Sequence, residues 1–279
     1  MPVFIFVSGY LSKRKSDYRT YLKKAISTCF IPYIVMNVIS WLPSHVGLTD
    51  LFSPKGIMWY LLSLFLWKLL VEMFLCMKWP LVVALLLALY TGFNSDIDST
   101  LSLSRTLCFF PFFLAGYICS AECLDKAKKL NKWFSVLTLA IIVVVAAILL
   151  RKGDTSIVFL YKGYHSLGQR FSEGIAWRSL VLLAGFSGVF FFISTASDKK
   201  SVITDFGRYS ITIYLGHWFV IQILKRFGTI NIHNTYMFII FDIAFSFAIC
   251  VLFGNKKLAQ AYHRIMDKIS SLIIVNDLA

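Results

Sequence analysis

The chain has 279 residues, of which 58% are hydrophobic and only 15% are charged. A soluble domain is roughly 45–50% apolar, so the composition excludes an ordinary soluble protein and indicates a bundle of membrane helices. The net charge of +14 does not predict nucleic-acid binding. The basic residues form short clusters between apolar runs, as in cytoplasmic loops of membrane proteins, with no basic face interleaved with aromatic residues.

The first apolar run covers residues 1–11 and is stopped by Lys13, Arg14 and Lys15. A helix needs about 20 apolar residues to cross the hydrocarbon core, so this run is too short to span alone. A basic cluster nevertheless ends it in the way that a cytoplasmic anchor ends a spanning helix. We therefore expect the chain to begin in the middle of a membrane helix.

A polar and basic stretch, residues 13–24, comes next and carries Tyr18, Tyr21 and Leu22 on one side. This pattern predicts a short interfacial helix. Residues 25–41 form the first complete apolar run, and Pro32 inside it predicts a kink that neighbouring helices tolerate.

Seven further apolar runs predict membrane segments, which makes nine with the partial first one. The stretches between them are polar or basic and predict loops or turns, among them a lysine-rich loop at 122–132, a long loop at 151–174 and a basic turn at 196–208. From Lys256 the chain predicts a basic amphipathic tail. With no repeat and no soluble insertion, the chain predicts one polytopic all-α domain over residues 1–279. The seven runs are 57–76, 79–93, 101–121, 133–150, 175–195, 209–224 and 235–253.

The distribution of lysine and arginine predicts the orientation of these segments. If Lys13 lies on the cytoplasmic side and the segments alternate, eighteen lysines and arginines fall inside and nine outside, with Lys68 in the middle of a segment. Basic residues favour the cytoplasmic side. The sequence thus predicts a multi-pass membrane protein with a cytoplasmic C-terminus.

His217 is a candidate catalytic residue, because an ionisable group at membrane depth is costly and often functional. A histidine with a near-neutral pKa can remove or return a proton, which acyl transfer to a hydroxyl requires. The alternative is a packed histidine bonded to a neighbouring hydroxyl, such as that of Tyr214 or Ser210.

Arg105 and Arg178 stand at the expected outer starts of two segments. Each is either a membrane-interface anchor or a binder of an anionic substrate group. Arg105 is the stronger candidate because Ser102 and Ser104 flank it in an otherwise apolar stretch. In the long loop, His165, Tyr161 and Tyr164 are expected in a solvated segment, with an outer substrate site as the alternative.

Two more sets of charged residues lie within the predicted segments. Lys68 and Glu72 are four residues apart, a spacing that favours an ion pair within one helix. Asp242 stands alone in the last segment and either faces a water-filled cavity or bonds a serine or tyrosine across the bundle.

The six cysteines predict no metal site. Cys119 and Cys123 are four residues apart, but no His/Cys pair completes a ligand set, so the cysteines are expected to be small packing residues in helices. No HExxH, GxSxG, Walker or GxGxxG motif is present. Any chemistry must come from residues scattered over several helices.

Five stretches, in order and at sensible spacing, resemble acyltransferase family 3, a family of integral-membrane O-acyltransferases, and within it the fucose 4-O-acetylase-like group. The stretches are MPVFIFVSGYL, KKAISTCFIPY, WYLLSLFLWKLL, SRTLCFFPFFLAGY and GRYSITIYLGHW.

The resemblance implies a bundle of about ten helices in the inner or plasma membrane, in contact with membrane lipids. It implies transfer of an acyl group, usually acetyl from acetyl-CoA, to a sugar hydroxyl of a cell-surface polysaccharide or its lipid-linked precursor. The family's key histidine lies on a first helix that precedes Met1, so this chain is expected to be N-terminally truncated. Basic family residues are replaced by Ser27 and Thr28, which leaves Lys23 and Lys24 to meet the CoA phosphates.

Two other readings of the sequence stay open. A transporter or flippase of glycan precursors would also be a polytopic bundle with scattered buried charges, although no inverted repeat of broken helices is visible. The second open possibility is that the chain is a truncated, inactive remnant of the family.

Overall fold

Helices make up every regular element in the described part of the chain, which comprises residues 1–41, 54, 56–93, 102–129, 132–151, 160, 163–165, 170–197, 199, 201–227 and 235–274 of this computed structural model. The predicted all-α fold is confirmed. Contacts group the chain into two compact units, Met1–Ser197 and Asp198–Ala279, and each is described by itself. A single domain over residues 1–279 stays a prediction.

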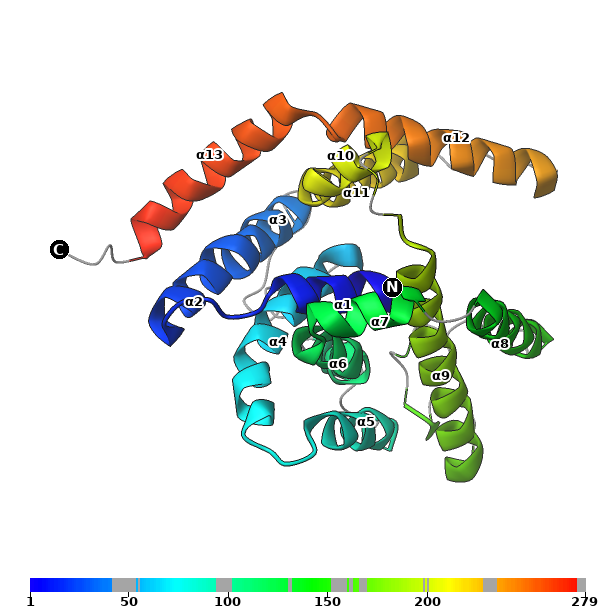
Figure 1. Ribbon diagram of the computed structural model, residues 1–279. Coiled ribbons are helices and arrows are strands. Elements are labelled where there is room, and N and C mark those ends of the chain that lie inside the picture. Colours follow the sequence, from blue (N-terminus) through cyan, green and yellow to red (C-terminus); the bar gives the residue numbers. More distant parts are fainter. Residues whose placement is uncertain are drawn as a thin grey trace. The chain divides into compact units, whose positions relative to one another are not determined.

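A helix lies at each of the nine places where the sequence predicts a membrane segment (Figure 1). The first unit contains α1 (Pro2–Leu11), α2 (Tyr18–Ala25), the π-helical η1 (Ile26–Phe30), α3 (Ile31–Trp41), the 3₁₀ turn η3 (Gly56–Met58), α4 (Trp59–Leu75), α5 (Pro80–Tyr90), α6 (Leu103–Ile118), α7 (Ala121–Lys129), α8 (Lys132–Arg151) and α9 (Phe171–Thr195). The second contains α10 (Val202–Arg208), α11 (Ser210–Phe227), α12 (Thr235–Phe253) and α13 (Lys256–Ile273).

Helix α6 forms the core of the first unit, because α1, α4 and α5 all pack against it. Its phenylalanines interleave with aromatic residues of the neighbouring helices: Phe113 lies 5.5 Å from the Trp67 ring of α4, and Phe112 lies 4.4 Å from Phe186 of α9. Burying each such ring contributes roughly 1.5–3 kcal/mol where it leaves water. The buried residues of α6 are Ser104, Thr106, Cys108, Phe109, Phe110, Pro111, Phe112, Phe113, Leu114 and Gly116.

Two glycines let α1 and α6 approach until their backbones touch. A side chain at Gly9 of α1 would overlap the carbonyl oxygen of Phe113, and one at Gly116 of α6 would overlap that of Phe6. Small residues at a helix crossing are the usual route to close packing between membrane helices. The short helix α1 is therefore an integral part of the core.

Hydrogen bonds between side chains also join the three helices α1, α4 and α6. Ser8 Oγ lies 2.6 Å from Tyr60 Oη, and Ser63 Oγ lies 2.7 Å from Thr106 Oγ1. The indole N–H of Trp67 donates to the Thr106 carbonyl at 2.6 Å. Paired in this way, polar groups are tolerated inside an apolar bundle.

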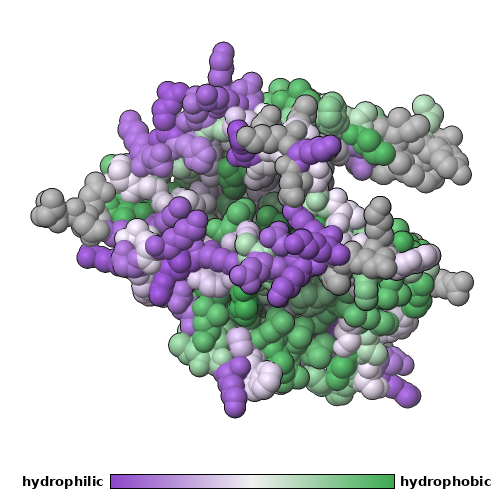
Figure 2. Space-filling model, in the orientation of Figure 1, coloured by the Kyte–Doolittle hydropathy of each residue, from purple (hydrophilic) through white to green (hydrophobic). Residues whose placement is uncertain are grey.

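Among the described residues, three helices are long and apolar enough to cross a membrane: Tyr18–Ile39, Gly56–Leu75 and Phe171–Thr195. A fourth is possible if α6 and α7, bent by 96° at their junction, are counted together. Figure 2 shows hydrophobic side chains over the α5 region of the surface and hydrophilic ones over α2 and α7. The exposed residues here include Trp79, just before α5, and Val82, Leu86 and Tyr90 within it. These features are those of a helical membrane bundle.

The predicted division between an interfacial helix at 13–24 and a separate span at 25–41 is wrong. The helix begins only at Tyr18, and it continues from α2 through the π-helical turns of η1 into α3. Asp17 caps its start, where the side chain accepts the N–H of Thr20 at 3.0 Å. Further along, the hydroxyl of Thr28 donates to the Lys24 carbonyl at 2.7 Å. A π-helical turn adds a residue without ending the helix.

Two stretches predicted as a loop and a turn contain helices. Residues 121–129 form α7, whose Glu122 lies in the first turn and whose lysines lie in the last turn, where each favours the helix dipole. Residues 202–208 form α10, which starts with a Ser201–Thr204 capping box. The charges in both stretches predict no helix by hydropathy, whereas the capping box and the helix-dipole charges stabilise one in each. Most of the loops predicted at 43–56, 94–100 and 151–174 lie outside the described residues.

Candidate functional site

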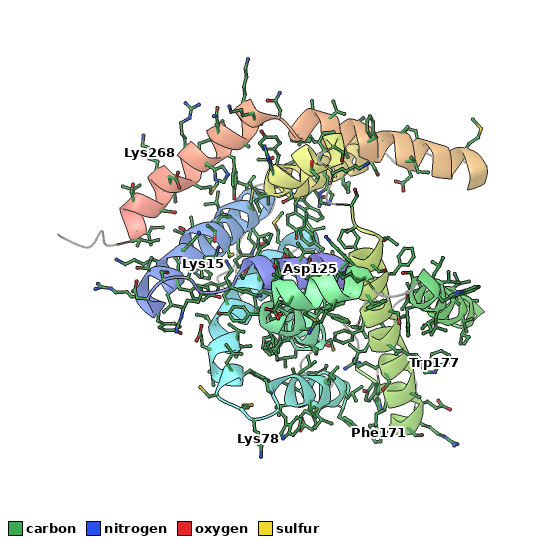
Figure 3. All side chains as sticks on the ribbon, in the orientation of Figure 1. Lys15, Lys78, Asp125, Phe171, Trp177 and Lys268 are labelled. Atoms are coloured by element: carbon green, nitrogen blue, oxygen red, sulfur yellow. The ribbon has the colours of Figure 1, made fainter. Side chains whose placement is uncertain are left out.

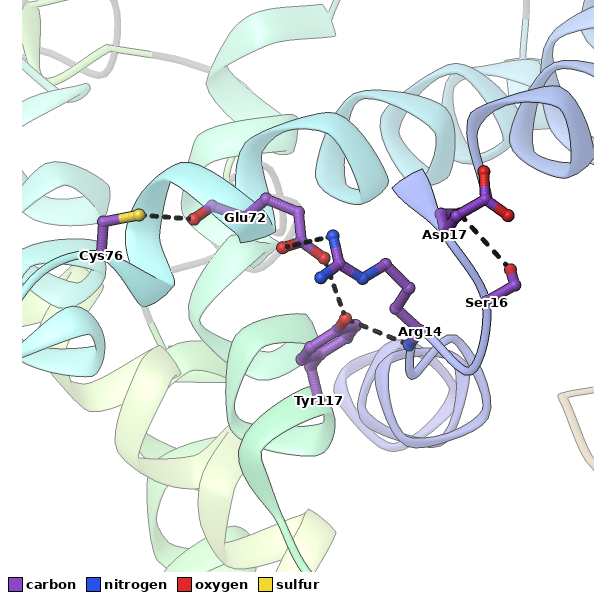
Figure 4. A network of polar contacts seen from close by, with 6 residues as sticks. All are labelled: Arg14, Ser16, Asp17, Glu72, Cys76 and Tyr117. Atoms are coloured by element: carbon purple, nitrogen blue, oxygen red, sulfur yellow. Dashed lines mark hydrogen bonds and ion pairs between the residues drawn. The ribbon is translucent and has the colours of Figure 1, made fainter. Parts of the chain in front are cut away.

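The C-terminal ends of α1, α4 and α6 meet in a network of charged and polar groups, here called the basic end (Figure 4). Arg14 Nη1 lies 3.3 Å from Glu72 Oε2. Tyr117 Oη donates to Glu72 Oε1 at 3.3 Å and accepts the backbone N–H of Arg14 at 3.1 Å. Lys13 Nζ donates to the Cys119 carbonyl. The carboxylate of Glu72 thus pairs with Arg14, and the predicted pair with Lys68 is not the one observed.

Helix α2 adds three residues to the basic end. Tyr21 is 7% exposed, and its hydroxyl has no hydrogen-bond partner among the described residues. Lys23 is half-buried and Lys24 is exposed. Exposed cations give α2 and α7 the hydrophilic surface of Figure 2; they are Arg14, Lys15 and Arg19 before and in α2, and Lys126 and Lys129 in α7. Such a surface can hold an anionic group by charge.

At the other end of α6, Arg105 and Arg178 mark what we call the arginine end, where α5 ends and α4, α6 and α9 begin. Arg105 is half-buried, and its guanidinium lies 5.2 Å above the Trp59 ring of α4. Trp59 in turn stacks on Phe109 at 5.7 Å. A guanidinium over an indole is held by the ring's negative face.

The hydroxyls beside Arg105 bind other parts of the chain. Ser104 Oγ donates to the Leu160 carbonyl at 3.1 Å, and Thr106 Oγ1 donates to the Ser102 carbonyl at 3.0 Å. These two contacts fix the first turn of α6. Ser102 and Ser104, whose position beside Arg105 made that arginine the stronger candidate, stabilise the helix that carries it.

Arg178 is only 3% exposed and contacts the C-terminal end of α5. It follows Trp177 in α9, which starts at Phe171 (Figure 3). Its Nη1 donates to the Ala88 carbonyl at 3.2 Å and to Thr91 Oγ1 at 2.9 Å. A cation at the last carbonyls of a helix is favourable. Arg178 therefore fixes the end of α5 in the first unit.

Tyr164 closes the same cluster from the long connection before α9. Its ring lies 4.9 Å from the Arg178 guanidinium, and a side chain at either Gly92 or Gly174 would overlap it. Its hydroxyl donates to the Leu89 carbonyl at 2.8 Å. Burial raises the pKa of the Tyr164 hydroxyl, and Arg178 partly opposes that rise. Tyr164 is buried, so the expected solvated position is wrong for it.

His217 lies in α11 of the second unit and is half-buried. Its Nδ1 lies 3.2 Å from the Ile213 carbonyl, one turn earlier in the helix, and its ring lies 5.6 Å from that of Tyr214. The observed hydrogen-bond partner is thus a backbone carbonyl, while the sequence suggested the hydroxyl of Tyr214 or Ser210. If Nδ1 donates, Nε2 is left as a base.

The predicted site residues fall into three places. Lys23 and Lys24 lie on α2 at the basic end, Arg105 and Arg178 lie at the arginine end, and His217 lies in the second unit. Arg105 and Arg178 have different neighbours, although Thr91, the partner of Arg178, lies 3.1 Å from Cys108 of α6. Asp242 on α12 is exposed. The roles assigned to all five site residues stay predictions.

Sequence reasoning missed Tyr117 and Trp59 and gave Glu72 the wrong partner. The only available signal was that Glu72 is the sole carboxylate in α4. Its partner lies 58 positions away in the sequence. No local pattern predicts that contact.

No group of three or more potential ligands for a metal ion occurs among the described residues. All six cysteines are free thiols. Cys29 and Cys108 are buried, as expected of packing residues, but Cys76 and Cys123 are exposed.

Comparison with known families gives one match over most of the chain. The family model of acyltransferase family 3, described as an acyltransferase domain, matches residues 1–255. No curated protein and no solved structure matches the chain. The matched region includes both ends of α6 as well as α11 and α12, and it stops just before α13.

Proposed function

The chain belongs to acyltransferase family 3, and on that premise we propose that it moves an acyl group, acetyl in the first instance, from acyl-CoA to a hydroxyl of a cell-surface polysaccharide or lipid-linked sugar. The family match over residues 1–255 carries this proposal. The fold agrees with it, because the described residues form an apolar helical bundle with cationic groups at both ends of α6.

The basic end is the proposed binding place of the CoA phosphates. Lys23 and Lys24 on α2 and Arg14 beside it supply positive charge there, and lysines bind phosphates as point charges. Arg14 already forms a partly exposed ion pair with Glu72. Such a pair contributes only about 0–1 kcal/mol, so a phosphate can compete with the carboxylate for Arg14.

The length of α6 fits a donor with a long arm. Arg105 and Tyr117 are twelve residues apart in this helix, which corresponds to about 18 Å. A donor bound by its phosphates at the basic end must carry its reactive carbonyl over this distance to reach Arg105. Acyl-CoA has its thioester at the far end of a flexible arm, whereas a compact donor would not connect the two ends.

In the proposed reaction, a general base takes the proton of the acceptor hydroxyl as its oxygen attacks the thioester carbonyl. The new C–O bond forms, the C–S bond breaks, and the proton passes from that base to the departing CoA thiolate. His217, in the second unit, stays the predicted base. Arg105 donates hydrogen bonds to the carbonyl oxygen while it carries negative charge. One such donor typically contributes 10²–10³-fold to the rate, and a positioned general base about 10²–10⁴-fold.

Arg178 was predicted to bind substrate or CoA, and its surroundings favour a positioning role. Its Nη1 donates to the Ala88 carbonyl and to the Thr91 hydroxyl at the end of α5, and its side chain is buried. We propose that Arg178 holds the arginine end in shape for Arg105 to act.

The proposed reaction also sets an orientation in the membrane. Acyl-CoA is a cytoplasmic metabolite, so the basic end faces the cytoplasm and the arginine end faces the acceptor on the outer side of the cell membrane. The lysine and arginine distribution favours the same orientation, with a cytoplasmic C-terminus. Membrane lipids and the acceptor sugar are then the partners of the protein, and no metal takes part.

The proposal is tested by expressing the chain in a host that makes candidate acceptors and following labelled acetyl from acetyl-CoA into isolated membranes and surface polymer. Arg105→Ala and His217→Ala should each lower the transfer rate at least about 100-fold. The matched controls are Arg170→Ala, an exposed arginine at the start of α9, and His263→Ala, a histidine that also contacts a tyrosine ring but lies in α13.

Normal transfer by the two variants would overturn the assigned roles of Arg105 and His217. Absence of any acetyl transfer by the folded wild-type chain, with label found in no membrane or polymer fraction, would overturn the acyltransferase proposal itself. Equal loss in the two control variants would attribute the effect to folding.

A further inference from the structure

The last helix, α13, lies outside the part of the chain that the family model matches. The match ends at residue 255, and α13 covers Lys256–Ile273. Only Gly254 and Asn255 separate it from α12. A side chain at Gly254 would overlap the Cys250 carbonyl, and Asn255 caps α13 by accepting the Lys257 N–H at 2.8 Å. The turn between the two helices is therefore short and well defined.

Apolar residues follow one another along a single side of α13 at helical spacing. Several of them are exposed, including Ile265 at 57% and Leu272 at 82%. The 18-residue helix is about 27 Å long, and its apolar stripe runs over the whole length. The stripe consists of Leu258, Ala261, Tyr262, Ile265, Ile269, Leu272 and Ile273.

The opposite side of α13 is polar and strongly basic. It carries four cationic side chains against the single carboxylate of Asp267, a net charge of +3 with His263 neutral. Figure 2 shows hydrophilic side chains over this helix, and Figure 3 labels Lys268 on it. The four cations are Lys256, Lys257, Arg264 and Lys268. Five charged residues make the helix too polar to cross a bilayer.

The helix before it, α12, is mostly apolar, and Asp242 is its one charged residue. Phe241, Ile243, Phe247 and Val251 of α12 are all exposed. In a membrane protein, lipid chains cover such residues. Because only two residues separate α13 from α12, its first turn lies where α12 leaves the lipid, and its exposed apolar stripe continues from a lipid-facing surface.

We propose that α13 lies in the plane of an anionic membrane surface, with its apolar stripe in the boundary between acyl chains and headgroups and its cations among the headgroup phosphates. A strongly amphipathic helix with lysine and arginine on its polar side binds membranes in this manner. Each cation near an anionic surface strengthens binding about fivefold. The partner is thus an anionic phospholipid bilayer, and this interaction is separate from acyl transfer.

Photo-crosslinking of the full chain in lipid nanodiscs tests the proposal without an activity readout. A photoreactive amino acid replaces Ile265 on the apolar stripe or, as a matched control five residues away, the exposed Gln260 on the polar side. Nanodiscs contain phosphatidylcholine alone or with phosphatidylglycerol. We expect lipid adducts from the probe at position 265, several-fold more than from position 260, and more in the presence of phosphatidylglycerol.

A charge variant sharpens the same experiment. Lys257→Gln together with Lys268→Gln should lower the lipid adducts at position 265 several-fold in the phosphatidylglycerol nanodiscs. Lys126→Gln with Lys129→Gln, on the basic helix α7, should leave them unchanged. Adducts from position 265 to peptides of this chain or of a second copy, equal yields at the two positions, or no dependence on phosphatidylglycerol would each overturn the proposal.

Discussion

At the basic end of the first unit, the guanidinium of Arg14 is paired with a carboxylate, whereas at the arginine end Arg105 lies over an indole ring and Arg178 donates to a helix carbonyl and a hydroxyl. The two ends also differ in how far their charged side chains are buried. The side chains of Arg14 and Glu72 are 40% and 24% exposed, while Arg178 is 3% exposed.

This comparison separates cations that can change partner from cations that hold the fold. Solvent screens the Arg14–Glu72 attraction, so the pair contributes at most about 1 kcal/mol and an arriving anion can replace the carboxylate. A buried guanidinium that already satisfies a helix end is costly to disturb. The basic end is therefore suited to binding and release, and the arginine end to fixed geometry.

The largest effect is expected from breaking the helix pair that connects the two ends. Gly9→Ala places a methyl group against the Phe113 carbonyl and should lower the free energy of unfolding by about 3 kcal/mol. Gly188→Ala on α9 is the control, because its new methyl group would meet only Ile142 at 3.9 Å; there the protein should gain about 0.5–1 kcal/mol. Thermal unfolding in detergent micelles measures both, and equal shifts would contradict the close contact.

Arg178→Gln should be the next most damaging change, costing about 2 kcal/mol because the contact with the end of α5 is lost. Arg14→Gln at the basic end should cost less than about 1 kcal/mol. Unfolding curves of the two variants compare the ends directly. A fully stable Arg178→Gln protein with a raised KM for acyl-CoA would instead place Arg178 in substrate binding.

Glu72→Gln is expected to change binding more than stability. The amide can still accept from Tyr117, but the charge that competes for Arg14 is gone. The KM for acyl-CoA should fall about two- to fivefold, the factor that corresponds to an exposed ion pair. Glu173→Gln, an exposed carboxylate in the first turn of α9 at the other end, should leave the KM unchanged. A raised KM in Glu72→Gln would show that the carboxylate assists binding.

The smallest expected effect is the acid sensitivity of the start of α2. Hydrogen bonds from the Thr20 side chain and backbone lower the pKa of Asp17 below its usual value of 3.8. Since the folded pKa is lowered, the cap stabilises α2 fully above about pH 4 and is lost as the pH falls through the folded pKa. Amide exchange at Thr20 should therefore accelerate in acid relative to Lys257, whose Asn255 cap does not titrate. In Asp17→Asn this difference should disappear.

The sequence predicted a helix at all nine apolar runs because the length of an apolar run is a local property. The bounds of the last one, 235–253, agree with α12. The short polar helices α7 and α10 and the continuity of α2 with α3 were missed, because capping groups and a π-helical turn decide them and hydropathy does not.

For the candidate site, the sequence found the arginines but not their partners. Arg105 and Arg178 are conspicuous as charges in apolar stretches, but Trp59 in α4 and Thr91 just after α5, which contact them, are ordinary residues far away in the sequence. The same holds for Glu72: spacing within one helix suggested Lys68, and the tertiary fold supplied Arg14. Long-range packing decides such pairs, and a single sequence does not contain that information in local form.

The contact between α1 and α6 at Gly9 and Gly116 also implies a delay during biosynthesis. Gly9 and Gly116 are 107 positions apart in the sequence, and a ribosome adds about 5–20 residues each second. About 5–20 s pass between the synthesis of α1 and that of the helix it must touch, backbone to backbone. During this interval α1 lacks the helix against which it packs in the folded protein. The bundle can therefore reach its final arrangement only after α6 has been synthesised.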